Sequence, residues 1–152
     1  MKKYNCLISK SIYTIKAGIF VFAIFILNSC QKDNDLNFIL QNEWKIKSIV
    51  NSNKSLYPPS NTLREEAYIL KFISDSSFYL ATSVNYAGGI CRFVSDKNII
   101  INRYGNFTEV GGETNFDEQL YFTLINVTQY SCSNSKLIFL IDKNNKIIFT
   151  KH

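Results

Sequence analysis

The chain has 152 residues, of which 46% are hydrophobic and 14% aromatic, and it carries 17 basic and 12 acidic side chains. Four of the lysines and none of the acids lie in residues 1–29, so the remaining 123 residues are nearly neutral, with 13 basic and 12 acidic side chains. Nucleic-acid binding requires a basic stripe on the folded domain; none stands out after residue 29, so we expect no nucleic acid among the partners.

Residues 1–29 have the three-part pattern of an export signal peptide. Lysines precede an apolar run of eleven residues from Ala17 to Leu27, and polar residues follow from Gln31 onward. A helix of that length covers about 16 Å, whereas the hydrocarbon core of a bilayer is about 30 Å thick. The alternative, an uncleaved anchor helix, is therefore the less favoured interpretation.

The segment Leu27-Asn28-Ser29-Cys30 resembles a bacterial lipobox. The resemblance implies cleavage before Cys30 and attachment of lipid, such as palmitate, to its sulfur. We then expect a signal peptide at 1–29, a lipidated N-terminus with a flexible tether at 30–42, and one β-rich domain at 43–152. The chain would be exported and lipid-anchored in the bacterial outer membrane, on its periplasmic face or at the cell surface. Residues 31–35 fit a surface-export tag or a plain polar tether.

Alternating apolar and polar residues predict strands through most of the domain. The predicted strands cover residues 44–50, 68–73, 77–82, 91–94, 99–102, 128–132, 136–141 and 146–150. Residues 51–62 contain both prolines of the chain and are expected to form a loop, as are the glycine-rich residues 104–113.

After this second loop, the spacing of the apolar residues changes from that of a strand to that of a helix. Apolar residues recur at 116, 120, 124 and 127, which is the spacing of one helical face. Thr114 or Asn115 can cap this helix, and Asp117 and Glu118 suit the positive end of its dipole. The sequence thus predicts a mainly β fold of the α+β class. We expect a compact antiparallel sheet or small barrel of about six to eight strands, with one packed helix near residues 115–127.

Two cysteines remain once Cys30 is used for lipid. Cys91 and Cys132 can form a disulfide in an oxidising compartment, where closing a loop of about forty residues would stabilise the fold by roughly 4 kcal/mol. Two separate buried thiols fit the sequence equally well.

The residue types that support catalysis or metal binding are sparse. The only histidine is His152 at the chain end, which excludes Ser-His and Cys-His pairs and imidazole-ligated zinc. There is no CxxC motif and no glycine-rich phosphate loop. The acids of the domain are expected to be solvated: Glu65, Glu66, Glu109, Glu113, Asp117 and Glu118. We therefore expect no catalytic, metal or cofactor site, and a protein that is not an enzyme.

The domain from Trp44 to Thr150 resembles the META-domain family of envelope lipoproteins of the heat-shock type. The resemblance follows the order of these segments: Trp44-Lys45-Ile46, Tyr68 to Ile73, Val84-Asn85-Tyr86-Ala87-Gly88-Gly89, Phe116 to Leu124, and Leu137 to Ile141. It implies a compact β-rich fold with a packed helix and no established catalytic site. Val84 stands where the family has a cysteine, so the family's disulfide does not carry over to Cys91 and Cys132.

Two functions follow as expectations. The first is a non-enzymatic interaction or stress-protective module, held to a membrane through lipid on Cys30, with a protein partner. The second is a carrier of a small apolar ligand, because Trp44 followed by alternating strands also resembles small lipocalin-like lipoproteins, whose barrels can enclose a ligand. The tyrosines of the domain would then line a cavity, although packing in the core is the favoured interpretation for them.

Overall fold

The structure is a computed structural model that describes residues 35–62, 64–94, 97–106 and 111–152. The predicted signal peptide and Cys30 lie outside these ranges. Residues 37–152 form one compact unit. Its elements are β1 (Glu43–Asn51), β2 (Lys54–Leu56), β3 (Ile69–Ser74), β4 (Ser77–Ala81), β5 (Tyr86–Phe93), β6 (Ile99–Asn106), α2 (Asn115–Leu124), β7 (Gln129–Ser133), β8 (Lys136–Leu140) and β9 (Lys146–Lys151). No helix among the described residues is long and apolar enough to span a bilayer.

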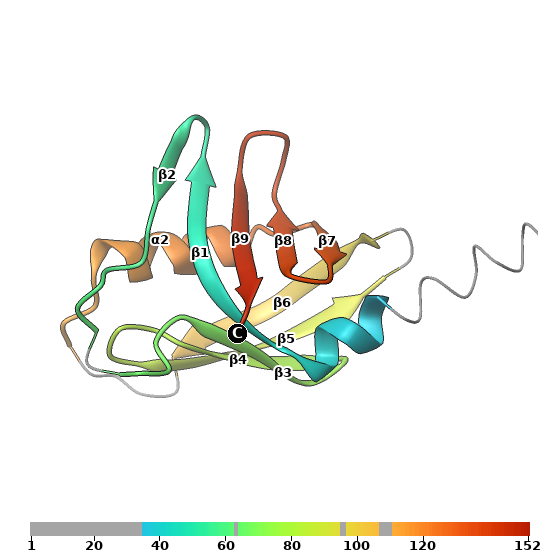
Figure 1. The fold of residues 1–152 in the computed structure, drawn as a ribbon, viewed down its shortest axis with the longest axis horizontal. Helices are drawn as coiled ribbons and strands as arrows, with labels where there is room; N and C mark the ends of the chain where they lie inside the picture. Colours follow the sequence, from blue (N-terminus) through green and yellow to red (C-terminus); the bar gives the residue numbers. More distant parts are fainter. Residues whose placement is uncertain (1–34, 63, 95–96, 107–110) are drawn as a thin grey trace, which may run out of the picture. The chain divides into compact units, whose positions relative to one another are not determined.

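The strands form a single antiparallel sheet that curls on itself (Figure 1). Its order is β6-β5-β4-β3-β1-β9-β8-β7, and β2 pairs with the far end of β1. The two edge strands approach each other: Asn98 bridges Gln129, and the Ile99 amide donates to the Thr128 carbonyl at 3.0 Å. The sheet is therefore nearly closed and barrel-like, which confirms the predicted mainly β fold class.

The side chains of alternate residues fill the interior of this sheet. On β8 and β9, Leu137, Phe139, Ile147 and Phe149 are all buried, and the two phenylalanine rings meet edge to face at 5.1 Å. The largest completely buried side chains come from the whole length of the domain: Trp44, Tyr68, Phe139, Phe149, Ile39, Ile49, Leu70, Leu80, Ile99, Leu120, Leu124 and Leu137. Because strand side chains alternate between faces, the intervening residues of β8 and β9 lie on the outside.

The pairing of β1 with β9 joins the two ends of the domain. Lys45 lies opposite Thr150, and Ile49 lies opposite Ile147. The register shifts between Ile46 and Ser48, which is the position of a β-bulge. At the chain end, the His152 amide donates to the Glu43 carbonyl at 2.9 Å.

Helix α2 begins at the residue that the sequence predicts. The side chain of Thr114 accepts from the Asp117 amide, and the Asp117 carboxylate accepts from the Thr114 amide, which is a capping box. Phe116, Leu120 and Leu124 form its buried face, and the helix contacts β6 and β9. It ends at Leu124, whereas the predicted helix continued to Val127.

Three segments differ from the sequence-based prediction. The predicted loop 51–62 contains the short strand β2, which brings the sheet to nine strands within the described ranges. Strands β5 and β6 extend further, to Tyr86 and Asn106, because they pair with each other along their whole length. Residues 35–41 of the predicted tether are helical, Ile39 is fully buried, and the Trp44 indole donates to the Ile39 carbonyl at 3.0 Å.

The inside–outside alternation of β8 can be tested with two neighbouring residues. Replacing Leu137 by Ala should lower the free energy of unfolding by about 3 kcal/mol, because a fully buried side chain leaves a cavity. Replacing Ile138 by Ala should cost about 1 kcal/mol, since its side chain is half-buried on the outer face. Urea unfolding of both variants measures the difference; equal losses would contradict the assigned register.

Candidate functional site

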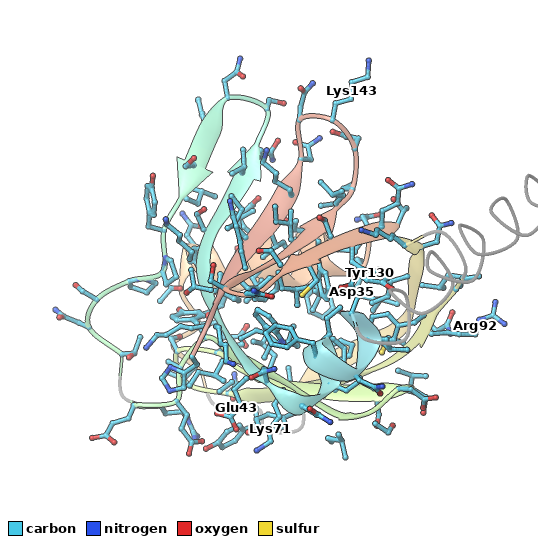
Figure 2. The ribbon with its side chains drawn as sticks, turned by 45° about the vertical axis from the view of Figure 1, so that its right-hand side comes forward. Asp35, Glu43, Lys71, Arg92, Tyr130 and Lys143 are labelled. Atoms are coloured by element: carbon cyan, nitrogen blue, oxygen red, sulfur yellow. The ribbon has the colours of Figure 1, made fainter. Side chains whose placement is uncertain are left out.

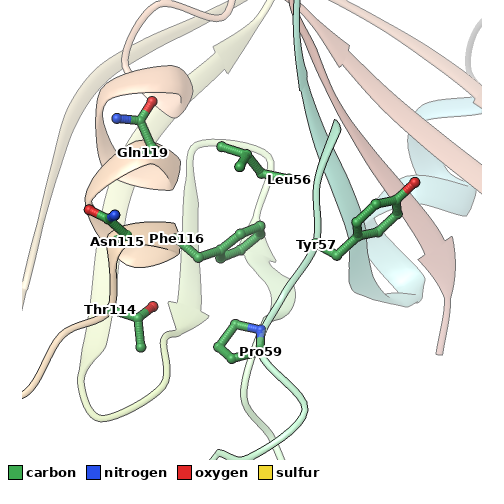
Figure 3. Close-up of a pocket in the computed structure, with 7 residues that line it drawn as sticks. All are labelled: Leu56, Tyr57, Pro59, Thr114, Asn115, Phe116 and Gln119. Carbon is green, nitrogen blue, oxygen red and sulfur yellow. The ribbon is translucent and has the colours of Figure 1, made fainter. Parts of the chain in front are cut away.

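A pocket of about 500 Å³ opens between β2 with its following segment and the beginning of α2 (Figure 3). Phe116 extends from the helix into the space between the helix and the opposite segment. We call this the β2–α2 pocket. Its lining residues are Leu56, Tyr57, Pro59, Thr114, Asn115, Phe116 and Gln119. The walls are thus mainly apolar, with one hydroxyl and two amide side chains on the helix side.

The hairpin register and the helix geometry determine where the side chains that line the pocket lie. The register of the β1–β2 hairpin sets Leu56 opposite Ile49, whose side chain is buried in the core, so Leu56 lies on the interior side of the ribbon. On the helix, Asn115 and Gln119 are four residues apart and lie on one side of α2, next to the buried face of Phe116. The pocket therefore brings together residues about sixty positions apart in the sequence.

A buried carboxylate lies directly behind one wall of this pocket. Asp117 is only 3% exposed. Its Oδ1 accepts from the Ser83 amide at 3.2 Å, and its Oδ2 accepts from the Ser83 hydroxyl and, at 2.8 Å each, from the amide and hydroxyl of Thr114. These bonds join the N-terminus of α2 to the loop between β4 and β5. Thr114 belongs to both features, because it lines the pocket and binds the carboxylate.

The hydrogen bonds keep Asp117 charged. Burial acts to raise the pKa of this carboxyl group, but the hydrogen bonds from Ser83 and Thr114 together outweigh burial, so its pKa is lowered. An ionised carboxylate that accepts four hydrogen bonds from the protein is a poor proton acceptor for a substrate. We therefore assign Asp117 a structural role: its hydrogen bonds hold Thr114, which lines the pocket, against the loop between β4 and β5. The sequence-based expectation that this acid is solvated was wrong.

Tyr68 completes the buried cluster from the other side. Its ring meets Phe116 edge to face at 5.1 Å, and its hydroxyl is near Thr114, Ser83 and Asp117 but hydrogen-bonds to none of the described residues. Burial raises its pKa to about 12, so the hydroxyl stays neutral.

The backbone of Tyr68 has φ of 67°, a left-handed conformation that is strained for an aromatic residue. Two neighbouring strands impose it, because the Tyr68 amide donates to Ala81 at 2.7 Å and its carbonyl accepts from Ile46 at 2.8 Å.

The loop between β4 and β5 is rigidly held. The Thr82 hydroxyl donates to the Asn85 carbonyl and accepts from the Asn85 amide, at 3.1 and 3.0 Å. The Asn85 side chain donates to Glu113 at 2.8 Å, just before the helix cap. Arg64 donates to the Val84 carbonyl at 3.1 Å, and its guanidinium lies 4.2 Å from the centre of the Tyr86 ring. The environment of Asp117 is therefore preorganised.

The residues singled out in the sequence do not converge on one site. Cys91 lies buried on β5 and Cys132 lies half-buried on β7, and the structure shows no disulfide between these two described residues. Burial, with a smaller effect of Asp75, raises the pKa of the Cys91 thiol to about 11, which makes it unreactive at neutral pH. The disulfide between them stays a prediction.

The acids and tyrosines are also dispersed. Glu65, Glu66 and Glu118 are exposed, and Glu109 lies outside the described residues. Among the described residues, no group of three histidine, cysteine, aspartate or glutamate side chains is arranged to hold a metal ion. Tyr68 and Tyr130 pack in the core, whereas Tyr57 is 67% exposed and lines the pocket.

The comparisons with known proteins concern the fold. No protein-family model matches the chain, and no curated protein matches its sequence. One similar solved structure is a DUF4847 family protein from Bacteroides vulgatus, with 15% identity and a TM-score of 0.54, covering 75% of this chain and 94% of that one. Another is a protein from Burkholderia xenovorans, with 12% identity and a TM-score of 0.59, covering 78% of this chain and 87% of that one. At these identities the likeness shows the fold alone.

The role of Asp117 as a charged brace can be tested by its pH dependence. Asp117→Asn should lower the free energy of unfolding at neutral pH by about 2 kcal/mol, because the amide replaces an acceptor with a donor in a buried site. The lowered pKa of Asp117 means that its contribution is present above the unfolded value of about 3.9 and is lost as the pH falls through the folded value.

The difference between wild type and Asp117→Asn should therefore shrink in acid. Denaturant unfolding at a series of pH values measures it. The neighbouring exposed Glu118→Gln is the matched control and should change stability little at any pH. A gap that stays constant down to strong acid would contradict a charged role for Asp117.

Proposed function

We propose that this chain is a lipid-anchored envelope protein whose folded domain is a non-enzymatic binding module, and that the β2–α2 pocket is its binding site. The observation that carries the proposal is the pocket itself: about 500 Å³, mainly apolar, and backed by a hydrogen-bonded cluster that fixes its helix wall. Pockets that bind small molecules have volumes of this order and a few polar groups that orient the ligand.

The lining defines the kind of ligand group that would fit. Leu56, Pro59 and Phe116 offer apolar contact, so most of the bound group should be apolar. Asn115 and Gln119 offer amide donors and acceptors on one side only, which suits a single hydrogen-bonding end. The lining residues include no carboxylate and no lysine, arginine or histidine, so none of them favours a charged ligand.

A lipocalin-like carrier is the second candidate, and the nearly closed sheet is compatible with it. Trp44, Phe139 and Phe149 are completely buried in the interior, so the space that a carrier would use for its ligand is occupied by side chains. In this protein the ligand of a carrier would therefore sit in the β2–α2 pocket. A stress-protective role rests on the META-domain resemblance alone.

The lipid anchor is tested in cells. Cys30→Ala in the full-length chain should move the protein from the detergent phase to the aqueous phase, since the anchor depends on acyl chains attached to that sulfur. Detergent-phase partition followed by immunoblotting measures the change. A variant that still partitions into detergent as completely as the wild type would overturn the anchor.

Binding to the pocket is tested with N-phenylnaphthylamine, an uncharged apolar dye whose fluorescence rises in apolar sites. The protein is the mature chain from residue 30 with Cys30→Ser, which keeps all the described residues. We expect saturable binding that Leu56→Ser weakens about tenfold, because that change removes roughly 1.4 kcal/mol of apolar contact.

Two further variants sharpen this test. Gln119→Trp places a large side chain at the pocket from an exposed helix position and should block binding. Ile100→Ser is the matched control, because Ile100 is exposed to the same extent as Leu56, 40%, and does not line the pocket. Dye affinity that is unchanged in both Leu56→Ser and Gln119→Trp would rule the pocket out as the binding site.

A further inference from the structure

The charged residues of the domain are segregated along the chain. Residues 44–56 and 129–151, which hold most of β1 with β2 and β7 to β9, contain seven lysines and a single acid, Asp142. Residues 57–128 contain five basic and eight acidic residues. Because β1 pairs with β9 and β9 with β8, the lysine-rich segments form one continuous half of the sheet.

The strand register places four of these lysines on the outer side of that half. Lys45 on β1 and Lys136 on β8 both lie opposite Thr150 of β9, so the three residues form one row across three strands. Lys146 lies two rows away on β9, and Lys47 sits exposed at the bulge of β1. We call these four residues the lysine face.

Apolar side chains occupy the middle of the lysine face. Ile148 of β9 lies opposite Ile138 of β8 in the row between the lysines, and Leu140 lies opposite Lys146. All three are half-buried on the outer surface. The face therefore combines cationic groups at its margins with a shallow apolar centre.

Of the acids, Glu43 shares the outer side of β1 with Lys45, but it is paired with Lys71. Within the described part of the chain, none of the four lysines of the lysine face is in an ion pair; the salt bridge that the structure shows joins Lys71 and Glu43 at 2.7 Å (Figure 2). Asp142 lies in the β8–β9 turn, next to the outward-pointing Lys143. Its carboxylate accepts from the Asn144 and Asn145 amides at 2.7 and 2.9 Å. The sequence showed no basic stripe because these lysines are scattered along it.

The lysine-rich half of the sheet also contacts the segment where the chain enters the folded unit. Phe38 is in the helical segment before β1, and the Lys151 ammonium lies 5.0 Å from the centre of its ring. Six residues, 31–36, lie between Cys30 and Asn37, so the two Cα atoms are at most about 25 Å apart even if the chain is fully extended. A lipid on Cys30 would therefore keep Asn37, where the folded unit begins, within about that distance of the bilayer surface.

We propose that the lysine face docks on an anionic phospholipid surface and so orients the domain on the membrane that anchors it. The inference rests on the proposed lipid anchor for its geometry. Lysines near an anionic bilayer each strengthen binding, by about fivefold, and they act only within roughly a Debye length of about 8 Å, so direct contact is required. The apolar centre formed by Ile138, Leu140 and Ile148 would rest against the headgroup region.

The test uses the mature chain with Cys30→Ser, so that any binding to vesicles comes from the folded domain and not from lipid. Co-sedimentation with vesicles of phosphatidylcholine containing phosphatidylglycerol should show binding that pure phosphatidylcholine does not, and added salt should reduce it. The double variant Lys45→Gln with Lys136→Gln should weaken binding about fivefold for each lysine. The full set of four lysine-to-glutamine changes should abolish it.

The control pair Arg92→Gln (Figure 2) with Lys97→Gln removes the same net charge from exposed positions on β5 and in the segment that follows it. It should leave vesicle binding nearly unchanged, and circular dichroism of all variants confirms folding. Equal losses in both pairs, or no preference for phosphatidylglycerol, would overturn the proposal. Binding to soluble heparin without binding to vesicles would also overturn it and assign the face to a polymeric anion. Because these chains lack the lipid, failure here leaves the Cys30 anchor test unaffected.

Discussion

The pairing of β1 with β9 is the contact on which the rest of the domain depends. It is the only link in the strand order of the described residues between β6-β5-β4-β3-β1 and β9-β8-β7. It brings Ile46 beside Phe149 and Ile49 beside Ile147, so residues a hundred positions apart share one core. Since most of the cost of such a contact is chain entropy, its strength must come from buried apolar area. The β1–β2 hairpin, and with it one wall of the pocket, is carried on the same strand.

The second constraint is the buried charge of Asp117. An isolated carboxylate in a core is costly, and it is tolerated here because four hydrogen bonds and the helix N-terminus compensate it. The same bonds determine where Thr114 lies, and therefore the shape of the pocket. Binding sites gain affinity when their walls are fixed before the ligand arrives. The Tyr68 hydroxyl hydrogen-bonds to none of the described residues, and the Tyr68 backbone is left-handed. Both features are unfavourable, so the packing around the carboxylate must offset them.

Local patterns in the sequence predicted most of the fold. The alternation in 44–50 and 136–141 and the spacing of Phe116, Leu120 and Leu124 gave the correct element types, because one face of each is buried against the core. Strand β2 could not be predicted, because all three of its residues are exposed and so give no alternation of apolar and polar positions. It is a strand only because its backbone pairs with β1. The pocket could not be predicted, because Leu56 and Phe116 meet only through the tertiary fold. Asp117 was identified as a helix-start residue, but nothing local shows that the β4–β5 loop buries it.

The pocket and the lysine face lie on opposite sides of the β1 ribbon. Leu56 lies opposite Ile49 on the interior side of β1, whereas Lys45 and Lys47 are exposed on its outer side. With the lysine face on a bilayer, the ribbon would separate the pocket from the lipid. A ligand would then reach the pocket from the aqueous side and not by lateral movement out of the membrane. The two proposals are thus compatible: the outer face of one strand orients the domain, and the inner face holds a wall of the binding site.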